Sequence, residues 1–259
     1  MNPPTLISVS NHSTHLSDAD GAKIVDALCV QLSRDYAPFY GPAPALEYVL
    51  KGKSSAHSDA VPFVISDKAT VPGAAGYHDE SSKGQPRGFV FVEPILSNGG
   101  TILQGGNSVS AALSHEALEL MGDVSANLWA DGPEGDDFAR ELSDAVEADS
   151  YVIDGVSVSN FVLPSFFDPN LHAGRFDFMS KLHAPFSMSA GGYQIKRTEP
   201  GNVSQVFARA GFAGQRSLVG IYGAGRRVVI VDFSPEFPAH KRAAKIERAR
   251  GRRCGKRVA

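Results

Sequence analysis

The sequence has few cysteines, no long apolar run and no signal-like N-terminus. Cys29 and Cys254 are its two cysteines, which excludes a disulfide framework and a thiolate zinc site. No apolar run approaches the roughly 20 residues that a membrane-spanning helix needs. The N-terminus, MNPPTLISVSNHS, lacks the basic start and apolar block of a secretory signal. We therefore expect a cytosolic protein without membrane contact, in which any metal ion would be held by His, Asp or Glu.

Charge is divided unevenly along the chain. The stretch from His240 onward contains nine Lys or Arg residues and one acid, Glu247, whereas the remainder contains 16 basic and 27 acidic residues. The body is therefore acidic and the tail basic. Such a tail is most often a solvated, flexible end, and nucleic acid or an acidic protein surface is its next most plausible partner.

The first half of the sequence alternates strand-like and helix-like segments. Apolar residues at helical spacing predict a helix that Ser17 caps and that ends near Pro38. Asn107 or Ser108 can cap a second helix, for which Gly122 is a suitable C-terminal residue. Strand-like runs bounded by Gly, Pro and polar residues occupy residues 5–10, 44–52, 61–67, 73–81 and 88–96.

The second half is predicted to be richer in β-structure. Residues 125–137 are typical of a loop, and residues 137–151 have the apolar spacing of a further helix. Short extended pieces separated by Gly and Pro follow, at 152–167, 191–198 and 216–233. We expect one domain over residues 1–165, a β-rich extension over 166–235 and a flexible basic tail over 236–259.

The stretch SHEALELMGD, residues 114–123, carries the most specific chemical signal. On a helix, His115, Glu119 and Asp123 project from one side, facing a cleft or solvent, while apolar residues face the core. The pattern H-E-x-x-E differs from the H-E-x-x-H of zinc hydrolases in its last position. Glu116 lies about 100° around the helix from His115, where a base can reach an activated water without being a ligand.

A third metal ligand must come from another segment, because a zinc ion usually takes about three protein ligands. On the predicted helix 137–151, Glu141 borders the apolar face and would need a partner, whereas Glu147 can remain in water. Asp144 lies further round, where it can orient a ligand, and Asp123 is a second candidate for this supporting role. Zinc is the favoured ion, but two carboxylates and one histidine also suit manganese or calcium. The alternative is that the motif is an ordinary solvated helix face.

The order of elements resembles the N-terminal subdomain of zincin metalloproteases. The resemblance covers roughly residues 5–150, in which a strand of GYHDE type precedes the helix bearing H-E. It implies an α+β fold with a mixed sheet, an active-site helix and an edge strand that holds peptide substrate, with Tyr77 and His78 as substrate-binding candidates. A strand-edge histidine is, however, more often simply exposed. Glutamate zincins take their third ligand from a following helix, which matches Glu141. The departure from the family is Glu119, where its members have histidine.

A second resemblance is to uncharacterised proteins encoded by bacteriophages and prophages. It rests on the segments GYHDE, RGFVFVEP, SHEALELMGD and ELSDAVEADSYVIDGVSVSNFVLPSFFDP, and proteins of this group carry H-E-x-x-E as such. It implies that Glu119 is the group's own ligand choice. The sequence thus favours a metal-dependent peptide hydrolase in the host cytoplasm. The alternative is a non-catalytic virion or assembly protein with the same fold, anchored through its basic tail.

Overall fold

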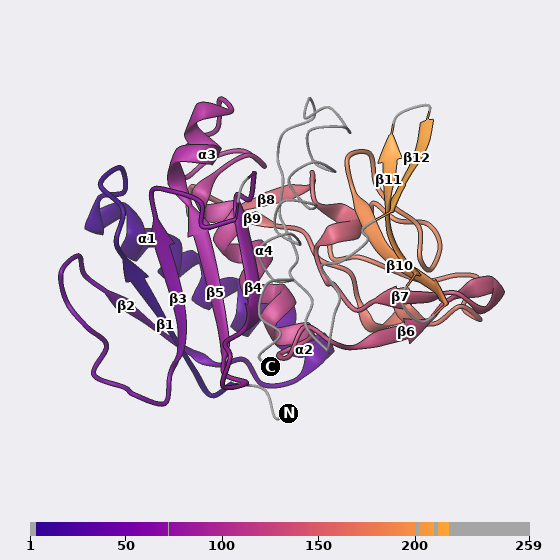
Figure 1. Cartoon of the computed structure of the whole chain (residues 1–259), viewed down its shortest axis with the longest axis horizontal. Coiled ribbons are helices and arrows are strands. Elements are labelled where there is room, and N and C mark those ends of the chain that lie inside the picture. The colour runs from indigo at the N-terminus through magenta and orange to yellow at the C-terminus, as the bar shows by residue number, and fades with distance from the viewer. Residues whose placement is uncertain (1–3, 72, 200–201, 210–211, 218–259) are drawn as a thin grey trace, which may run out of the picture.

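Five predicted strands assemble into one mixed sheet in the computed structural model of the chain, which describes residues 4–71, 73–199, 202–209 and 212–217. The sheet order is β2-β1-β3-β5-β4 (Figure 1). Its strands are β1 (Leu6–Asn11), β2 (Ala45–Val49), β3 (Val61–Ser66), β4 (Gly76–Glu80) and β5 (Pro86–Phe91). All run parallel except β4, which is antiparallel to β5 at the sheet edge. The expected α+β class with a mixed sheet is confirmed.

The strand register creates one apolar face, because alternate residues of a strand point to the same side. Val9 of β1 lies beside Phe63 of β3, and Ile65 of β3 lies beside Val90 of β5. All four side chains are fully buried. This face of the sheet therefore forms one side of the main core.

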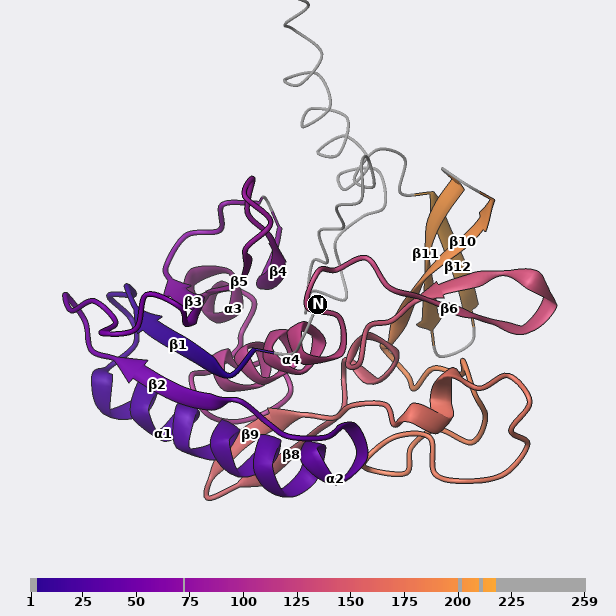
Figure 2. The same cartoon turned by 90° about the horizontal axis from the view of Figure 1, so that it is seen from below.

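Two long helices cover this apolar face (Figures 1 and 2). Helix α1 (Asp18–Val30) begins where expected, with the Ser17 hydroxyl accepting a hydrogen bond from the Asp20 amide at 3.0 Å. Helix α4 (Val109–Gly122) begins in the same way, with Ser108 as its cap. The two local capping signals therefore locate both helix starts.

The first helical segment extends further than the sequence predicted. Beyond α1, a π-helical turn (Gln31–Tyr36) leads into the short helix α2 (Ala37–Tyr40). Pro38, which was expected to end the helix, instead lies in the first turn of α2, where its missing amide hydrogen costs no internal hydrogen bond. The chain then turns at Gly41, whose φ of 97° favours glycine.

The predicted helix over residues 137–151 is wrong. Residues Asp137–Ala139 form strand β7, and only Asp144–Val146 form a short 3₁₀ turn. The strand pairs with β6 (Trp129–Asp131), which was expected to be a loop, and with β10 (Tyr193–Glu199). Pairing with a strand more than fifty residues later in the chain thus overrides the local helical spacing.

A second five-stranded sheet contains these strands, in the order β12-β11-β10-β7-β6 (Figure 1). It is completed by β11 (Asn202–Arg209) and β12 (Phe212–Ser217). The β-rich character expected of residues 166–235 is therefore observed as far as residue 217, the last described residue. Because β6 and β7 precede residue 165 and β10 follows it, the sheet spans the boundary at which we expected the first domain to end. The first two expected domains, residues 1–165 and 166–235, therefore share one sheet.

A hairpin completes the packing around α4. It consists of β8 (Ser150–Ile153) and β9 (Val156–Ser159). The Ser159 amide donates to the Ser114 hydroxyl at 2.9 Å, and that hydroxyl donates to Gln31 at 2.6 Å. Figure 2 shows α4 lying centrally, between the first sheet and this hairpin. The motif helix is therefore enclosed on several sides.

Several shorter elements complete the described structure. Helix α3 (Val92–Ser97) follows β5, so the end of the run predicted as a strand over 88–96 is helical. Short 3₁₀ turns occupy Pro133–Gly135 and Pro164–Phe167. Within the described ranges, none of the helices has the length and apolar character needed to span a bilayer. The predicted basic tail, residues 236–259, and the strand-like run from 218 to 233 lie outside the described residues.

Candidate metal centre

Helix α4 buries the H-E-x-x-E motif completely. His115 is 1% exposed, and Glu116 and Glu119 are 0% exposed, so the expectation that this helix side faces a cleft or solvent is not met. His115 Nε2 lies 2.9 Å from Glu119 Oε1, one helical turn away. The spacing thus brings the two predicted ligands together, as a helix requires of residues four apart.

His78 joins this group from the edge strand. It shares the inner face of the sheet with Gly88, its partner on β5, and is fully buried instead of exposed. Its Nδ1 lies 3.3 Å from Glu116 Oε2 and 3.6 Å from Glu119 Oε2. Its Nε2 lies 4.0 Å from Glu141 Oε2. His78 therefore contacts three carboxylates, although strand-edge histidines are usually solvated.

Glu141 and Asp144 reach the same place from the segment after β7. Glu141 lies in an irregular stretch and not on a helix, yet its side chain is buried beside His78. Asp144 opens the 3₁₀ turn, and its Oδ1 lies 3.3 Å from His115 Nε2. Glu147, expected to remain in water, is 8% exposed. The segment folds inward because Leu142 and Val146 are fully buried in the main core.

Close approach of these segments depends on residues without bulky side chains. A Cβ atom at Gly76 of β4 would lie 3.0 Å from Glu116 Oε1 and 2.9 Å from the Phe89 carbonyl. A Cβ atom at Gly192 would lie 2.2 Å from the Ala145 carbonyl. Glycine therefore permits β4 to approach α4, and β10 to approach the Asp144 turn.

Tyr193 is a member of this region that the sequence did not indicate. It begins β10 and is 1% exposed. Burial raises the pKa of its phenol well above the usual value, and the charges of Asp144 and Glu147 raise it further. Tyr193 therefore keeps its proton and can act as a hydrogen-bond donor. Tyr151 does not belong to this group, because its hydroxyl donates to Asp35 at 2.8 Å.

The electrostatics of the group follow from its burial and its many acids. Burial raises the pKa of Glu116 well above 4.5, and the charge of Glu119 raises it further. For His115, burial lowers the pKa, but the hydrogen bond that its ring N–H donates to the Asp144 carboxylate and the charge of Glu116 outweigh it, so the pKa is raised. Within the described part of the chain, Glu116 Oε1 makes no hydrogen bond. A buried oxygen of this kind favours a bound cation.

The residues present fit a divalent metal ion. Two ligands on one tetrahedral zinc ion, each about 2.0–2.1 Å from the metal, lie about 3.3–3.4 Å apart. The contacts of His115 with Glu119 and Asp144 are 2.9 and 3.3 Å, and those of His78 with Glu116 and Glu119 are 3.3 and 3.6 Å. Imidazole and carboxylate donors suit zinc and manganese alike. The residues that could share an ion form two overlapping groups, His115 with Glu116 and Glu119, and His78 with Glu119 and Glu141, so the predicted His115 and Glu141 fall in different groups joined by Glu119.

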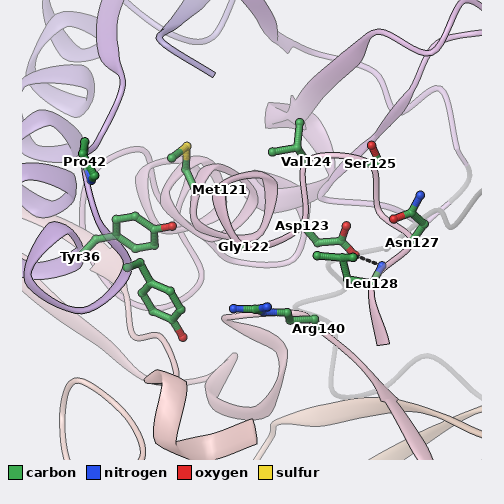
Figure 3. A pocket seen from close by; sticks show the side chains of 11 residues that line it. Tyr36, Pro42, Met121, Gly122, Asp123, Val124, Ser125, Asn127, Leu128 and Arg140 are labelled. Carbon is green, nitrogen blue, oxygen red and sulfur yellow. Dashed lines mark hydrogen bonds between the residues drawn. The ribbon is translucent and has the colours of Figure 1, made fainter. Parts of the chain in front are cut away.

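Two predicted site residues, Asp123 and Tyr77, lie outside the group formed by His115, Glu119 and His78. Asp123, an expected supporting residue, accepts a hydrogen bond from the Leu128 amide at 2.7 Å. It lines a pocket of about 250 Å³ at the C-terminal end of α4, with Tyr36 and Arg140 (Figure 3). Tyr77 neighbours His78 in sequence and therefore points to the opposite face of the sheet. There its ring packs at a tilt of 34° against Phe89, at a centroid distance of 4.9 Å.

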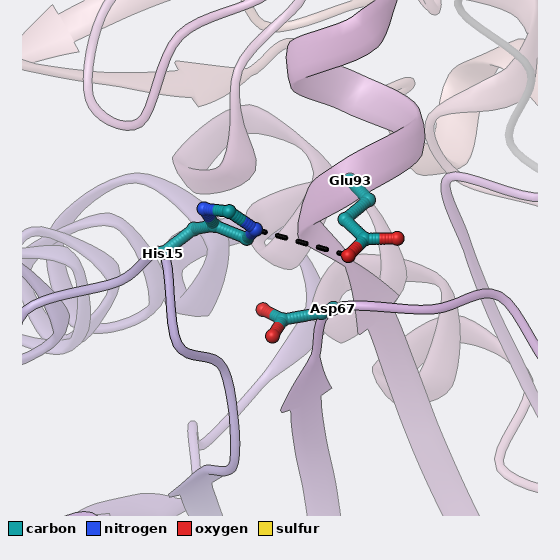
Figure 4. Close-up of side chains that lie close together, drawn as sticks. All are labelled: His15, Asp67 and Glu93. Atoms are coloured by element: carbon teal, nitrogen blue, oxygen red, sulfur yellow. Dashed lines mark ion pairs between the residues drawn. The ribbon is translucent and has the colours of Figure 1, made fainter.

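A second cluster of similar composition lies where β1, β3 and β5 end (Figure 4). His15 Nε2 lies 3.8 Å from Glu93 Oε1, and both side chains are nearly half exposed. The nearby Asp67 accepts hydrogen bonds from the hydroxyls of Ser13 and Thr14 and from the Thr14 amide. Partial burial opposes ionisation of Asp67, but these hydrogen bonds outweigh it and lower its pKa to about 2. This cluster therefore holds a loop in place.

Comparison with known proteins adds no further assignment. No family model, curated protein or solved structure matches this chain. The candidate centre therefore stands on its own geometry.

Proposed function

We propose that this protein is a metal-dependent hydrolase that cleaves peptide bonds at the His115-Glu116-Glu119 site. The observation that carries the proposal is the buried meeting of these three residues with Glu141 and His78. Two overlapping sets of these residues, His115 with Glu116 and Glu119, and His78 with Glu119 and Glu141, each have the spacing to hold a cation. Glu116 also supplies a carboxylate oxygen without a hydrogen bond in the described part of the chain.

His115, Glu119 and Glu141 would hold the ion, with His78 as a further ligand. When bound, a divalent ion acts as a Lewis acid that makes water a better nucleophile near neutral pH. Asp144 Oδ1 lies 3.3 Å from His115 Nε2, the same nitrogen that faces Glu119, so Asp144 would act as a further ligand and not as the orienting group that the sequence suggested.

Glu116 is the general base in this proposal. Its raised pKa suits it to take a proton from water and to pass that proton to the leaving amine. Tyr193 keeps its phenolic proton and hydrogen-bonds to the Asp144 carboxylate, so it would donate to charge that develops on the substrate oxygen only by exchanging that partner. The reaction thus needs one base and one donor, and the cluster contains both.

The edge strand supports peptide as the substrate class. Strand β4 ends the first sheet, runs antiparallel to its neighbour and contributes His78 to the centre. An extended peptide can add to such an edge through main-chain hydrogen bonds. The zincin resemblance of the sequence implies the same use of this strand.

The test is cleavage of unstructured peptides by protein loaded with zinc or manganese, followed by mass spectrometry. We expect cleavage that a chelator abolishes, and a loss of about 10²–10⁴-fold in Glu116→Gln. Glu93→Gln, in the partly exposed cluster, is the matched control and should retain full activity. Equal cleavage by wild type and Glu116→Gln, or none with either metal, would contradict the proposal.

A second candidate is a non-catalytic virion or assembly protein that uses the same ion for stability. It is favoured by the burial of the centre, because Glu116, Glu119 and His78 are all 0% exposed and a hydrolase must admit water and substrate. In this case the basic tail would anchor the protein to nucleic acid or to an acidic neighbour. Metal-dependent stability without peptide cleavage would favour this candidate.

A further inference from the structure

The two carboxylate oxygens of Glu119 face different histidines. Oε1 lies 2.9 Å from His115 Nε2, whereas Oε2 lies 3.6 Å from His78 Nδ1. Each histidine also has an acidic neighbour of its own. Asp144 Oδ1 lies 3.3 Å from His115 Nε2, and Glu141 Oε2 lies 4.0 Å from His78 Nε2, the ring nitrogen next to the one that faces Glu119. One ligand atom of each of His78, Glu119 and Glu141 lies within 4.8 Å of the other two. The donors therefore form two groups, one on α4 and one beneath β4, that share Glu119.

We infer that the centre binds two divalent metal ions, with the Glu119 carboxylate bridging them. One ion would take His115 and Asp144, and the other would take His78 and Glu141. Ions in two-metal sites generally lie about 3.5–4 Å apart, a spacing that one carboxylate group can span. The inference deepens the proposed function and rests on its metal centre, but it concerns the number of ions and not the reaction.

The charges of the buried groups favour two ions over one. Glu116, Glu119, Glu141 and Asp144 are each at most 3% exposed, and Glu147, whose charge acts on His115, is 8% exposed. If the first four are ionised and both histidines are neutral, as metal ligands are, two divalent ions match the charge of these four, and Glu147 adds one further negative charge. A single divalent ion would compensate two of these four negative charges and leave the other two without a counter-charge. Uncompensated buried charge is costly.

The position of Glu116 agrees with this arrangement. Its Oε2 lies 3.3 Å from His78 Nδ1, on the side of the second group, although the residue belongs to α4 and to the first group. Its Oε1 lies against Gly76 and makes no hydrogen bond in the described part of the chain. Glu116 thus lies between the groups, and its Oε1 remains available as a base.

The first measurement needs no variant. Chelated protein is reloaded with manganese, excess ion is removed, and the metal content is counted by elemental analysis and native mass spectrometry. We expect about two ions per chain, and the electron paramagnetic resonance spectrum of a magnetically coupled pair. One ion per chain with the spectrum of isolated manganese would overturn the inference, as would a protein that binds none.

Variants assign the two positions. His78→Ala and His115→Ala should each lose about one ion and the coupled spectrum, because each removes one terminal ligand. Glu119→Gln, nearly equal in size, should lose the coupling even where the fold is kept. His15→Ala, in the partly exposed cluster, should retain both ions. Full metal content in His78→Ala with native circular dichroism would contradict a second ion beneath β4.

The outcomes separate this inference from the proposed function. Two ions without peptide cleavage would support the paired centre and refute the hydrolase. Chelator-sensitive cleavage with a single ion would support the hydrolase and refute the paired centre.

Discussion

The molecule contains two clusters of histidine and carboxylate groups that differ in how they are surrounded. The cluster of His15, Asp67 and Glu93 lies where parallel strands end, and its histidine is nearly half exposed. The cluster around His115 and Glu119 is enclosed by the first sheet, α4 and the segment before β8. Exposed charges are solvated at little cost, whereas buried ones need compensation. Similar residue types therefore support a loop in one place and favour a metal ion in the other.

The largest expected difference between the clusters is in metal-linked stability. His115→Ala should remove the stabilisation that a bound ion provides, which is about 3–4 kcal/mol when the free ion is at 100–1,000 times its Kd. His15→Ala, the matched control, should change the free energy of unfolding by less than about 0.5 kcal/mol. Urea unfolding with and without chelator measures both. Equal effects of the two substitutions would remove the distinction between the clusters.

The pH dependence of stability should reverse sign when the ion is removed. In metal-free protein, Glu116 and His115 have raised pKa values. Glu116 therefore holds its proton in the folded state above pH 4.5, where it is lost in the unfolded state, and His115 does the same above pH 6.5. Stability should fall as pH rises from about 5 to about 8, and Glu116→Gln should weaken this slope.

Metal-loaded protein should show the opposite slope over the same range. Binding requires deprotonated ligands, so the ion binds more tightly as pH rises. Thermal unfolding at several pH values, with metal or with chelator, gives both slopes. Parallel slopes would show that no ion links these groups to folding.

A smaller effect is expected in the partly exposed cluster. Asp67→Asn should destabilise the protein by about 1–2 kcal/mol at neutral pH, because the hydrogen bonds to the Asp67 carboxylate favour its charged form. The pKa of Asp67 is lowered from 3.8 to about 2. Its contribution is therefore complete above pH 3.8 and is lost as pH falls through about 2.

Asp59→Asn, at an exposed position, is the control for this substitution. Denaturant unfolding should show the Asp67→Asn deficit shrinking below pH 3.8 while Asp59→Asn stays close to wild type. A deficit that does not change with pH would mean that the carboxylate charge is not what stabilises the loop.

Features with local causes could be predicted from the sequence. Ser17 and Ser108 cap the helices as expected, and the five strands of the first sheet lie where apolar runs indicate them. His115 and Glu119 meet because residues four apart on a helix are neighbours. Each of these results depends on residues close together in the chain.

Features with distant causes could not be predicted. Residues 137–139 form a strand because β10, more than fifty residues later, pairs with them. The same long-range packing buries Glu147 and brings Tyr193 toward Asp144. His78 is buried because α4 covers its face of the edge strand, which strand periodicity alone does not reveal. The contact between His115 and Glu119 is thus set by the helix alone, whereas the positions of His78, Glu141 and Asp144 depend on tertiary structure.

The central claim, that the buried cluster holds a divalent ion, is tested most directly by thermal unfolding of chelated protein during titration with zinc or manganese. We expect a stoichiometric rise in melting temperature for wild type, and a much smaller rise for His115→Ala, because binding to the folded state alone stabilises it. The contradicting result is a melting temperature that neither ion moves in wild type, together with purified protein that contains no stoichiometric metal. The motif would then be an ordinary buried helix face.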